Sequence, residues 1–137
     1  MKQSILILTL MICITASFAD EKYPKLTHNK SINELLTKYD IEKDAQKKQF
    51  YLIAAAEQHS GLASMLLAKE VNTPDTQKIK YYLKAAKYGY PSQSYKTIAE
   101  IYKKGIGIQK DDFKSECYVN LSKSTPSKPL IEVCKSR

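Results

Sequence analysis

The amino-acid sequence predicts an all-α protein, a short α-solenoid of about three antiparallel helix pairs with a capping C-terminal tail. Three observations support this fold class. Apolar residues recur with helical spacing, as Tyr81, Ala85 and Tyr88 do at positions i, i+4 and i+7. No run shows the alternation with a period of two that indicates a strand. Similar segments also repeat along the chain, which is typical of solenoids.

The first residues are typical of a secretory signal peptide. Lys2 provides a positive charge ahead of an apolar run at Ile5–Ile14. The small residues Ser17 and Ala19 then occupy the −3 and −1 positions of a cleavage site before Asp20. The apolar run is well short of the ~20 residues that span a bilayer, so we expect no stable membrane insertion. We therefore expect residues 1–19 to be removed and the protein to be periplasmic or secreted.

Export changes how the charge of the chain is interpreted. The 118 residues that remain include 21 basic and 14 acidic side chains, a net charge near +7. This length suits one domain with a hydrophobic core, expected at residues 31–125 after an N-terminal extension at 20–30. Export makes nucleic acid an unsuitable partner, so we expect none. The charge favours an acidic protein or an anionic envelope surface, although it can also serve solubility alone.

Two cysteines, Cys117 and Cys134, remain after the expected cleavage. An even number of cysteines in an oxidising compartment predicts a disulfide, which would tether the tail at residues 126–137. The alternative is a pair of free thiols. Cys13 would be lipidated if the leader were that of a lipoprotein, but Ile12 is bulky where such a leader has a small residue.

Three segments of the chain align as copies of one unit. The first two are residues 44–59 and 74–89, and the third begins at Asp111. A tyrosine and a pair of alanines recur at equal places: Tyr51, Tyr81 and Tyr118, with Ala55-Ala56 and Ala85-Ala86. The helices between these segments also align, once one inserted residue near Pro91 and a shorter loop in the middle copy are allowed. One helical hairpin cannot bury such an apolar face alone, so the copies are expected to stack.

Local signals indicate where helices begin and end. Ser31 and Glu34 have the spacing of a capping box at the first helix. Pro91 precedes a later helix, for which Ser92 is the expected N-cap. Gly105 and Gly107 are expected to end that helix.

The run Tyr102–Asp111, followed by Tyr118, resembles the Sel-one-like repeat (SLR), a relative of the tetratricopeptide repeat (TPR). The SLR pattern has Tyr, Gly-x-Gly-Val, Asp, a central Trp or Tyr, and Lys-Ala-Ala-x-x-Gly. Lys84–Gly89 matches the last part, and Ala55–His59 matches it with His in place of Gly. The resemblance covers about residues 44–122 and implies a TPR/SLR-like superhelix that binds proteins.

The chain departs from the SLR pattern in three places. Ile108 stands for Val, and the middle copy lacks the Gly-x-Gly loop. Ser122-Lys123 replaces the alanine pair in the last copy, which indicates a terminal unit covered by the tail.

No arrangement of residues predicts catalysis, a cofactor or a metal site. Gly105-Ile106-Gly107 lacks the third glycine, the preceding strand and the Gly-Lys-Ser/Thr ending of a phosphate loop. His28 and His59 have no ligand spacing. The acidic pair Asp111-Asp112 lies at an expected helix start, where negative charge is favourable. We therefore expect that the protein is not an enzyme.

The sequence contains ten tyrosines and no tryptophan. Tyrosine offers rigid, amphipathic contact area and is enriched where binding energy concentrates. Four tyrosines at pattern positions are expected to be buried: Tyr51, Tyr81, Tyr102 and Tyr118. The candidate partner-binding residues are tyrosines off those positions and lysines that could form a basic rim: Tyr82, Tyr88, Tyr90, Tyr95, Lys96, Lys103 and Lys104.

These observations favour an exported protein–protein interaction module, expected to be a monomer, that binds a protein in the bacterial envelope or outside the cell. A sharper form is an immunity or inhibitor protein against an envelope-targeted toxin. One alternative is a small cysteine-bridged SLR enzyme acting on cell-wall-derived or β-lactam compounds, although the cysteine pair occurs here once rather than in each repeat. Another is a secreted virulence factor that binds host proteins.

Overall fold

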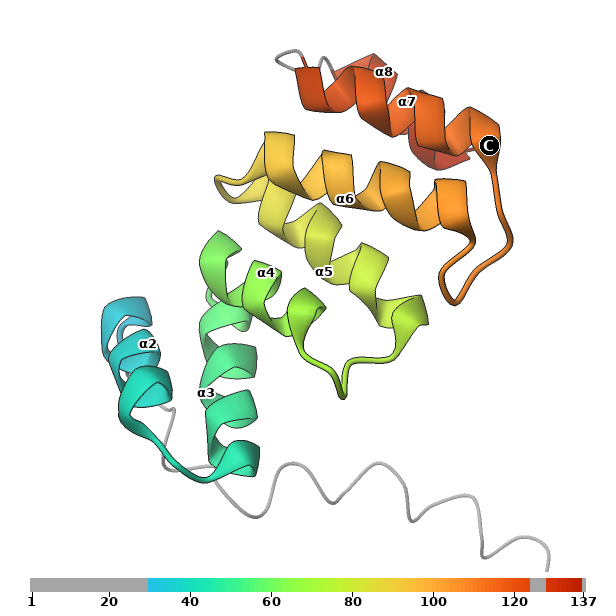
Figure 1. The fold of residues 1–137 in the computed structure, drawn as a ribbon. Coiled ribbons are helices and arrows are strands. Elements are labelled where there is room, and N and C mark those ends of the chain that lie inside the picture. The colour runs from blue at the N-terminus through green and yellow to red at the C-terminus, as the bar shows by residue number, and fades with distance from the viewer. Residues whose placement is uncertain (1–29, 124–127, 137) are drawn as a thin grey trace, which may run out of the picture. The chain divides into compact units, whose positions relative to one another are not determined.

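The computed structural model describes residues 30–123 and 128–136 (Figure 1). The expected signal peptide and its cleavage site lie outside these residues. The described residues form helices and no strands, which confirms the all-α prediction. The helices are α2 (Ile32–Ile41), α3 (Ala45–Glu57), α4 (Gly61–Lys69), α5 (Asp75–Lys87), α6 (Pro91–Lys104), α7 (Asp112–Lys123) and α8 (Lys128–Ser136).

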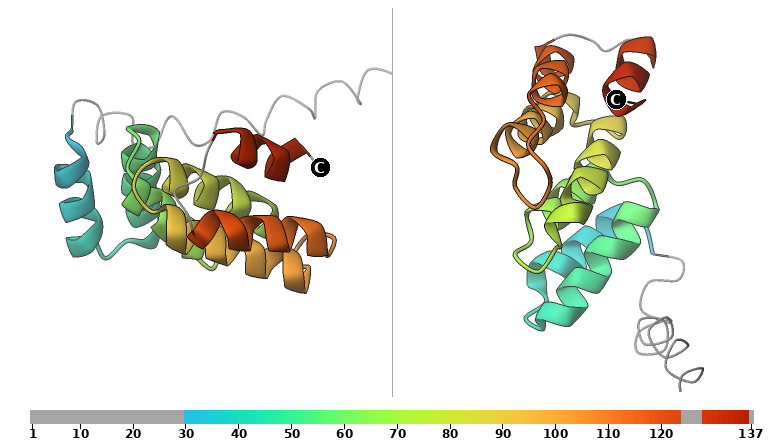
Figure 2. Two further views of the ribbon diagram at one scale, coloured as in Figure 1. Left: turned by 90° about the horizontal axis from the view of Figure 1, so that it is seen from above. Right: turned by 90° about the vertical axis from the view of Figure 1, so that its right-hand side faces the viewer.

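Each helix packs chiefly against its neighbours in sequence, as the views in Figure 2 also show. The helices α2 and α3, α4 and α5, and α6 and α7 form the three antiparallel pairs that the repeats predict, and α8 packs against α7. Contacts between sequence neighbours are what stacked helical repeats require. The solenoid-like fold class is therefore confirmed for the described residues.

Polar side chains accept hydrogen bonds from free backbone amides at the starts of α2, α3, α4 and α7. The Asp44 and Asp111 carboxylates accept hydrogen bonds from the backbone amides three residues later, at 2.9 and 2.8 Å. Ser31 caps α2 in the same way, at 3.3 Å. The prediction for Ser92 is wrong. Tyr90 is the N-cap of α6, because Pro91 is already helical, and the Ser92 hydroxyl instead donates to the Ser122 carbonyl oxygen at 2.9 Å.

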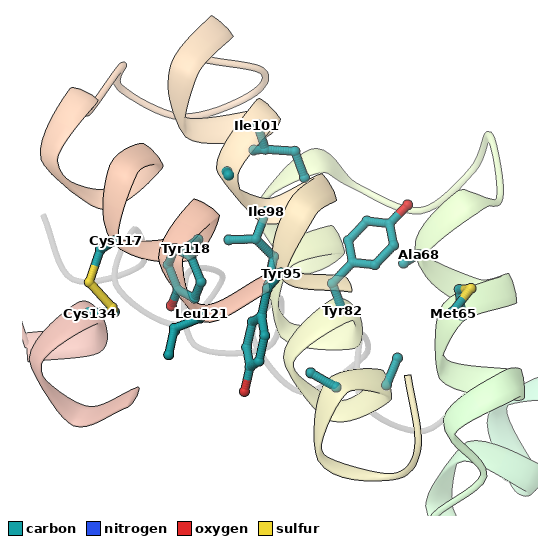
Figure 3. Packing of buried hydrophobic residues seen from close by; sticks show 13 residues of the cluster. Met65, Ala68, Tyr82, Tyr95, Ile98, Ile101, Cys117, Tyr118, Leu121 and Cys134 are labelled. Atoms are coloured by element: carbon teal, nitrogen blue, oxygen red, sulfur yellow. A yellow bond between two sulfur atoms is a disulfide. The ribbon is translucent and has the colours of Figure 1, made fainter. Parts of the chain in front are cut away.

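The core runs from α4 to α8 and is built from aromatic, aliphatic and small residues (Figure 3). The Tyr118 ring lies at its centre, with ring centroids 5.9 Å from Tyr95 and 5.8 Å from Tyr102. Burial is the main cause that raises the pKa of Tyr118 to about 12, and the nearby Tyr102 and Tyr95 contribute to the same increase. Tyr51 and Tyr118 are buried as predicted, whereas the prediction is wrong for Tyr81 and Tyr102, which are half-buried.

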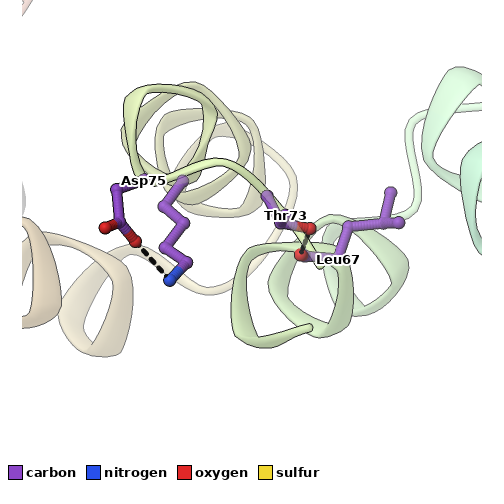
Figure 4. A network of polar contacts seen from close by, with 4 residues as sticks. Leu67, Thr73 and Asp75 are labelled. Atoms are coloured by element: carbon purple, nitrogen blue, oxygen red, sulfur yellow. Dashed lines mark hydrogen bonds and ion pairs between the residues drawn. The ribbon is translucent and has the colours of Figure 1, made fainter. Parts of the chain in front are cut away.

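The loop between α4 and α5 replaces the Gly-x-Gly loop that the middle copy lacks. The buried Thr73 hydroxyl donates to the Leu67 carbonyl oxygen at 2.6 Å, and Asp75 at the start of α5 pairs with Lys78 (Figure 4). A Cβ at Gly107 would overlap the Asp75 side chain, so the α6–α7 loop lies directly against the start of α5. The two loops therefore fix consecutive repeats to each other.

The C-terminal tail folds as α8. The Cys117 and Cys134 sulfur atoms lie at disulfide distance, with Cα atoms 5.7 Å apart, which confirms the predicted pairing. Cys134 is fully buried, and Leu130 and Ile131 pack against the same core. A terminal helix thus covers α7, as the loss of the alanine pair in the last copy predicts.

Candidate partner-binding surface

Two of the candidate binding tyrosines belong to the core instead. Tyr82 and Tyr95 are each 5% exposed, so they offer no contact area to a partner, and that prediction is wrong. Tyr82 occupies the place of the fully buried Leu52 in the preceding copy. Tyr95 packs against the Tyr118 ring. The inward face of each helix is therefore wider than the stripe marked by the repeated tyrosines.

The other two tyrosines lie at the turn between α5 and α6. Tyr90 is 39% exposed, and Tyr88 is half-buried. The Tyr88 ring stacks on His59, with centroids 4.6 Å apart and an interplanar angle of 20°. The Lys87 ammonium lies 5.1 Å from the centroid of the Tyr88 ring, within the range of a cation–π contact. The turn therefore presents an ordered aromatic cluster with a positive charge.

His59 was not among the candidate residues, although the sequence contained a signal for it. It stands where the next copy has Gly89, and both residues have positive φ angles, 70° and 119°. A non-glycine residue in this region is uncommon and suggests a role for its side chain. Here the exposed imidazole supplies the stacking partner of Tyr88.

Two of the three candidate lysines, Lys103 and Lys104, lie apart from this cluster. Lys96, Lys103 and Lys104 are exposed on α6, and the last two end the helix. With a rise of ~1.5 Å per residue, the C-terminal end of α6 lies roughly 20 Å from Tyr90. The structure therefore does not combine the predicted tyrosines and lysines into one patch.

A hollow of about 170 Å³ lies between α3, α4 and α5, and we call it the α3–α5 groove. Its floor is largely apolar and its rims are charged, with these lining residues: Ile53, Ala56, Glu57, Leu67, Lys80, Tyr81 and Lys84. Glu57 forms the α3 rim, and Lys80 and Lys84 form the α5 rim. None of these three makes an ion pair with a described residue.

The aromatic cluster lies at one end of the α3–α5 groove. His59 follows Glu57 by two residues, and Tyr88 follows Lys84 by four, one helical turn. Because His59 and Tyr88 stack, they join the C-terminal ends of α3 and α5. The groove, with its apolar floor and charged rims, and the stacked rings therefore lie on the same two helices, α3 and α5, or at their C-terminal ends.

A larger hollow of about 430 Å³ adjoins the α6–α7 loop, lined by Tyr102, Ile108, Gln109, Lys110, Asp111 and Lys114. Its polar groups are engaged in holding the loop. Asp111 caps α7, and its amide donates to the Tyr102 carbonyl oxygen at 3.0 Å. The Lys114 ammonium lies 5.4 Å from the centroid of the Tyr102 ring. This hollow therefore lies beside the α6–α7 loop, and Asp111 and Lys114 in its lining are already engaged in contacts there.

The described residues contain no group of three or more His, Cys, Asp or Glu side chains that could hold a metal ion. None of their helices is long and apolar enough to cross a membrane.

Comparison with known proteins gives no assignment. No protein-family model, no curated protein and no solved structure matches the chain. The function must therefore be argued from the surface itself.

Proposed function

We propose that the protein is an exported protein–protein interaction module that binds an acidic protein partner in the bacterial envelope or outside the cell. The observation that carries this proposal is the aromatic cluster of His59, Tyr88 and Tyr90 beside the α3–α5 groove. The His59 and Tyr88 rings stack on each other, and the helices that carry them are packed. Surfaces that are ordered before binding lose less conformational entropy on association.

The distribution of charge supports an acidic partner. The helix α5 carries four lysines and one acidic residue, whereas α2 and α3 together carry three of each. The positive charge is thus concentrated on the helix that ends at the Tyr88–Tyr90 turn. A local excess of one charge speeds association with a partner of opposite charge and favours that partner over others.

Export is supported by two independent features. One is the signal-peptide pattern of Lys2 and the apolar run before Asp20. The other is the Cys117–Cys134 pair, because disulfides persist in oxidising compartments and are rare in the cytosol. Fractionation of cells into cytoplasm, periplasm and medium tests this part. Recovery of the full-length chain from the cytoplasm alone would contradict it.

Affinity capture tests the binding function. The chain from Asp20 onward is used to capture proteins from envelope extract, in parallel with a Tyr88→Ala/Tyr90→Ala variant. Loss of aromatic contacts at the centre of an interface weakens binding by about 2 kcal/mol or more, roughly 30-fold. We expect one partner to be retained by the unmodified chain and lost by the variant. Val71→Ala, at a 93% exposed residue in the α4–α5 loop, is the matched control. Equal retention by all three chains would refute a role for the cluster.

A further inference from the structure

The alignment of the three copies identifies one equivalent helix face on each of α3, α5 and α7. Tyr51 on α3, Tyr81 on α5 and Tyr118 on α7 are equivalent. The residues one position before and three positions after each tyrosine are spaced i and i+4, so they form one stripe on the helix surface. The stripe consists of Phe50 and Ala54 on α3, Lys80 and Lys84 on α5, and Cys117 and Leu121 on α7.

On α7 this stripe is covered by α8. Cys117 is bonded to Cys134 of α8, and Leu121 is fully buried (Figure 3). The covering helix has nine residues and is amphipathic, with Leu130 and Ile131 packed against the core. The protein thus contains its own example of a short amphipathic helix docked on this face.

On α5 the described part of the chain supplies no such cover. The stripe carries Lys80 and Lys84, which border the α3–α5 groove. Tyr81 beside them is half-buried, whereas its equivalents Tyr51 and Tyr118 are buried. The three tyrosines hold the same place in the repeat, and Tyr81 is the one that lines an open groove. The groove therefore exposes apolar surface at a position where α7 has a helix docked.

We infer that the α3–α5 groove docks a short amphipathic helix of the partner protein, with acidic residues along one edge, much as α8 docks on α7. This inference rests on the proposed function and adds the chemistry of the partner. A hollow of about 170 Å³ has room for one large apolar anchor side chain among Ile53, Leu67 and Tyr81. Carboxylates one turn apart on the docked helix pair with Lys80 and Lys84.

The charges on the two rims set the orientation of the docked helix. Glu57 on the α3 rim is negative, and the two lysines on the α5 rim are positive. A helix with acidic residues on one edge and basic residues on the other therefore fits in one direction and is repelled in the reverse direction. An evenly anionic surface, such as a vesicle or a nucleic-acid backbone, would bring negative charge against Glu57. The groove is thus better suited to a peptide helix than to either of those.

The test uses the full chain after residue 19 and three fluorescent peptides of about 16 residues, long enough to form helix. The peptides share one leucine-lined face and differ along one edge, which carries Glu, Gln or Lys. Fluorescence anisotropy should show the Glu peptide binding at least about tenfold more tightly than the Lys peptide, the size expected of a few exposed ion pairs. The Lys80→Glu/Lys84→Glu variant should reverse this order. The Lys103→Glu/Lys104→Glu variant, with the same change of charge on α6, should leave it unchanged.

Several outcomes would overturn the inference. They are equal binding of the three peptides, an order that Lys80→Glu/Lys84→Glu leaves intact, and an equal response of both charge variants. Circular dichroism of each variant confirms that its helices are intact, so that a loss of binding is not a loss of fold. Binding of anionic vesicles through Lys80 and Lys84 without any peptide preference would also overturn it.

Affinity capture with the same variants separates this inference from the proposed function. A captured partner that Lys80→Glu/Lys84→Glu retains in full overturns the groove as the docking site and leaves the interaction module standing. Loss of the partner by that variant, with retention by Lys103→Glu/Lys104→Glu, supports both. Peptide binding with the expected charge order, but no partner in any envelope or host extract, supports the groove and refutes the proposed function.

Discussion

Removal of the Cys117–Cys134 disulfide should lower the stability of the protein by about 3 kcal/mol. The bond joins residues separated by 17 positions, and closing a loop of that length restricts the unfolded chain by about this amount. For a domain of this size, the loss corresponds to a decrease in Tm on the order of 10 °C or more. Without the disulfide, packing alone should hold α8 weakly, because its apolar residues Leu130 and Ile131 are only half-buried.

The assay is urea unfolding followed by circular dichroism for the oxidised chain, the reduced chain and a Cys117→Ala/Cys134→Ala variant. The oxidised chain should have the highest midpoint, and reductant should lower that midpoint without affecting the variant. If α8 separates before the rest unfolds, the loss of stability in the main transition should be smaller, and an early transition should appear. Equal midpoints and transition shapes for the oxidised chain and the variant would refute the reasoning.

Three further predictions concern the core and can be read from the same unfolding curves. Ser94→Ala should leave stability unchanged or raise it by about 1 kcal/mol, because the buried hydroxyl has no hydrogen-bond partner among the described residues; a clear loss would contradict this. Gly61→Ala should cost about 1–3 kcal/mol, since its Cβ would overlap the Tyr88 carbonyl oxygen, and an unchanged midpoint would show that α4 can shift. Stability should fall as the pH rises from about 10 towards 12, because the unfolded chain ionises at the ordinary tyrosine pKa while the folded state keeps Tyr118 neutral up to about 12. Tyr118→Phe should make this decrease shallower, and an identical slope would rule out Tyr118 as its source.

The sequence predicts the repeat and its boundaries well, because those depend on local signals. The caps at Asp44 and Asp111 occupy equal places in their copies and have the same geometry in the structure. Gly105 ends α6 in the left-handed conformation with φ 67°. A capping carboxylate or a left-handed glycine acts on its own turn, so its position can be inferred without knowing the neighbouring helices.

Burial is harder to predict, because it depends on the neighbours of a helix. The stripe marked by Tyr51, Tyr81 and Tyr118 is only part of the inward face. Tyr82 and Tyr95 were assigned to the surface and instead fill the core between helices. A helix in a stacked repeat contacts two neighbours, so its buried face is broader than that of a helix packed on one side.

The α3–α5 groove could not be predicted from any single segment. Its apolar floor draws on three helices, and the half-buried Tyr81 is part of it. A comparison of stripe residues between copies would have shown Lys80 and Lys84 in the places of Cys117 and Leu121.

Packing between sequence neighbours also governs how the folded chain opens. Because each helix depends chiefly on the next, local unfolding can begin at an end and advance one helix at a time. The two ends differ, since α2 buries one residue, Leu35, whereas α8 is held by a covalent bond. Backbone amides should therefore exchange with solvent earliest in α2 and progressively later towards α6. The proposed binding surface on α3 and α5 lies on the side from which this opening proceeds, so a docked partner would slow the exchange of helices that it never touches.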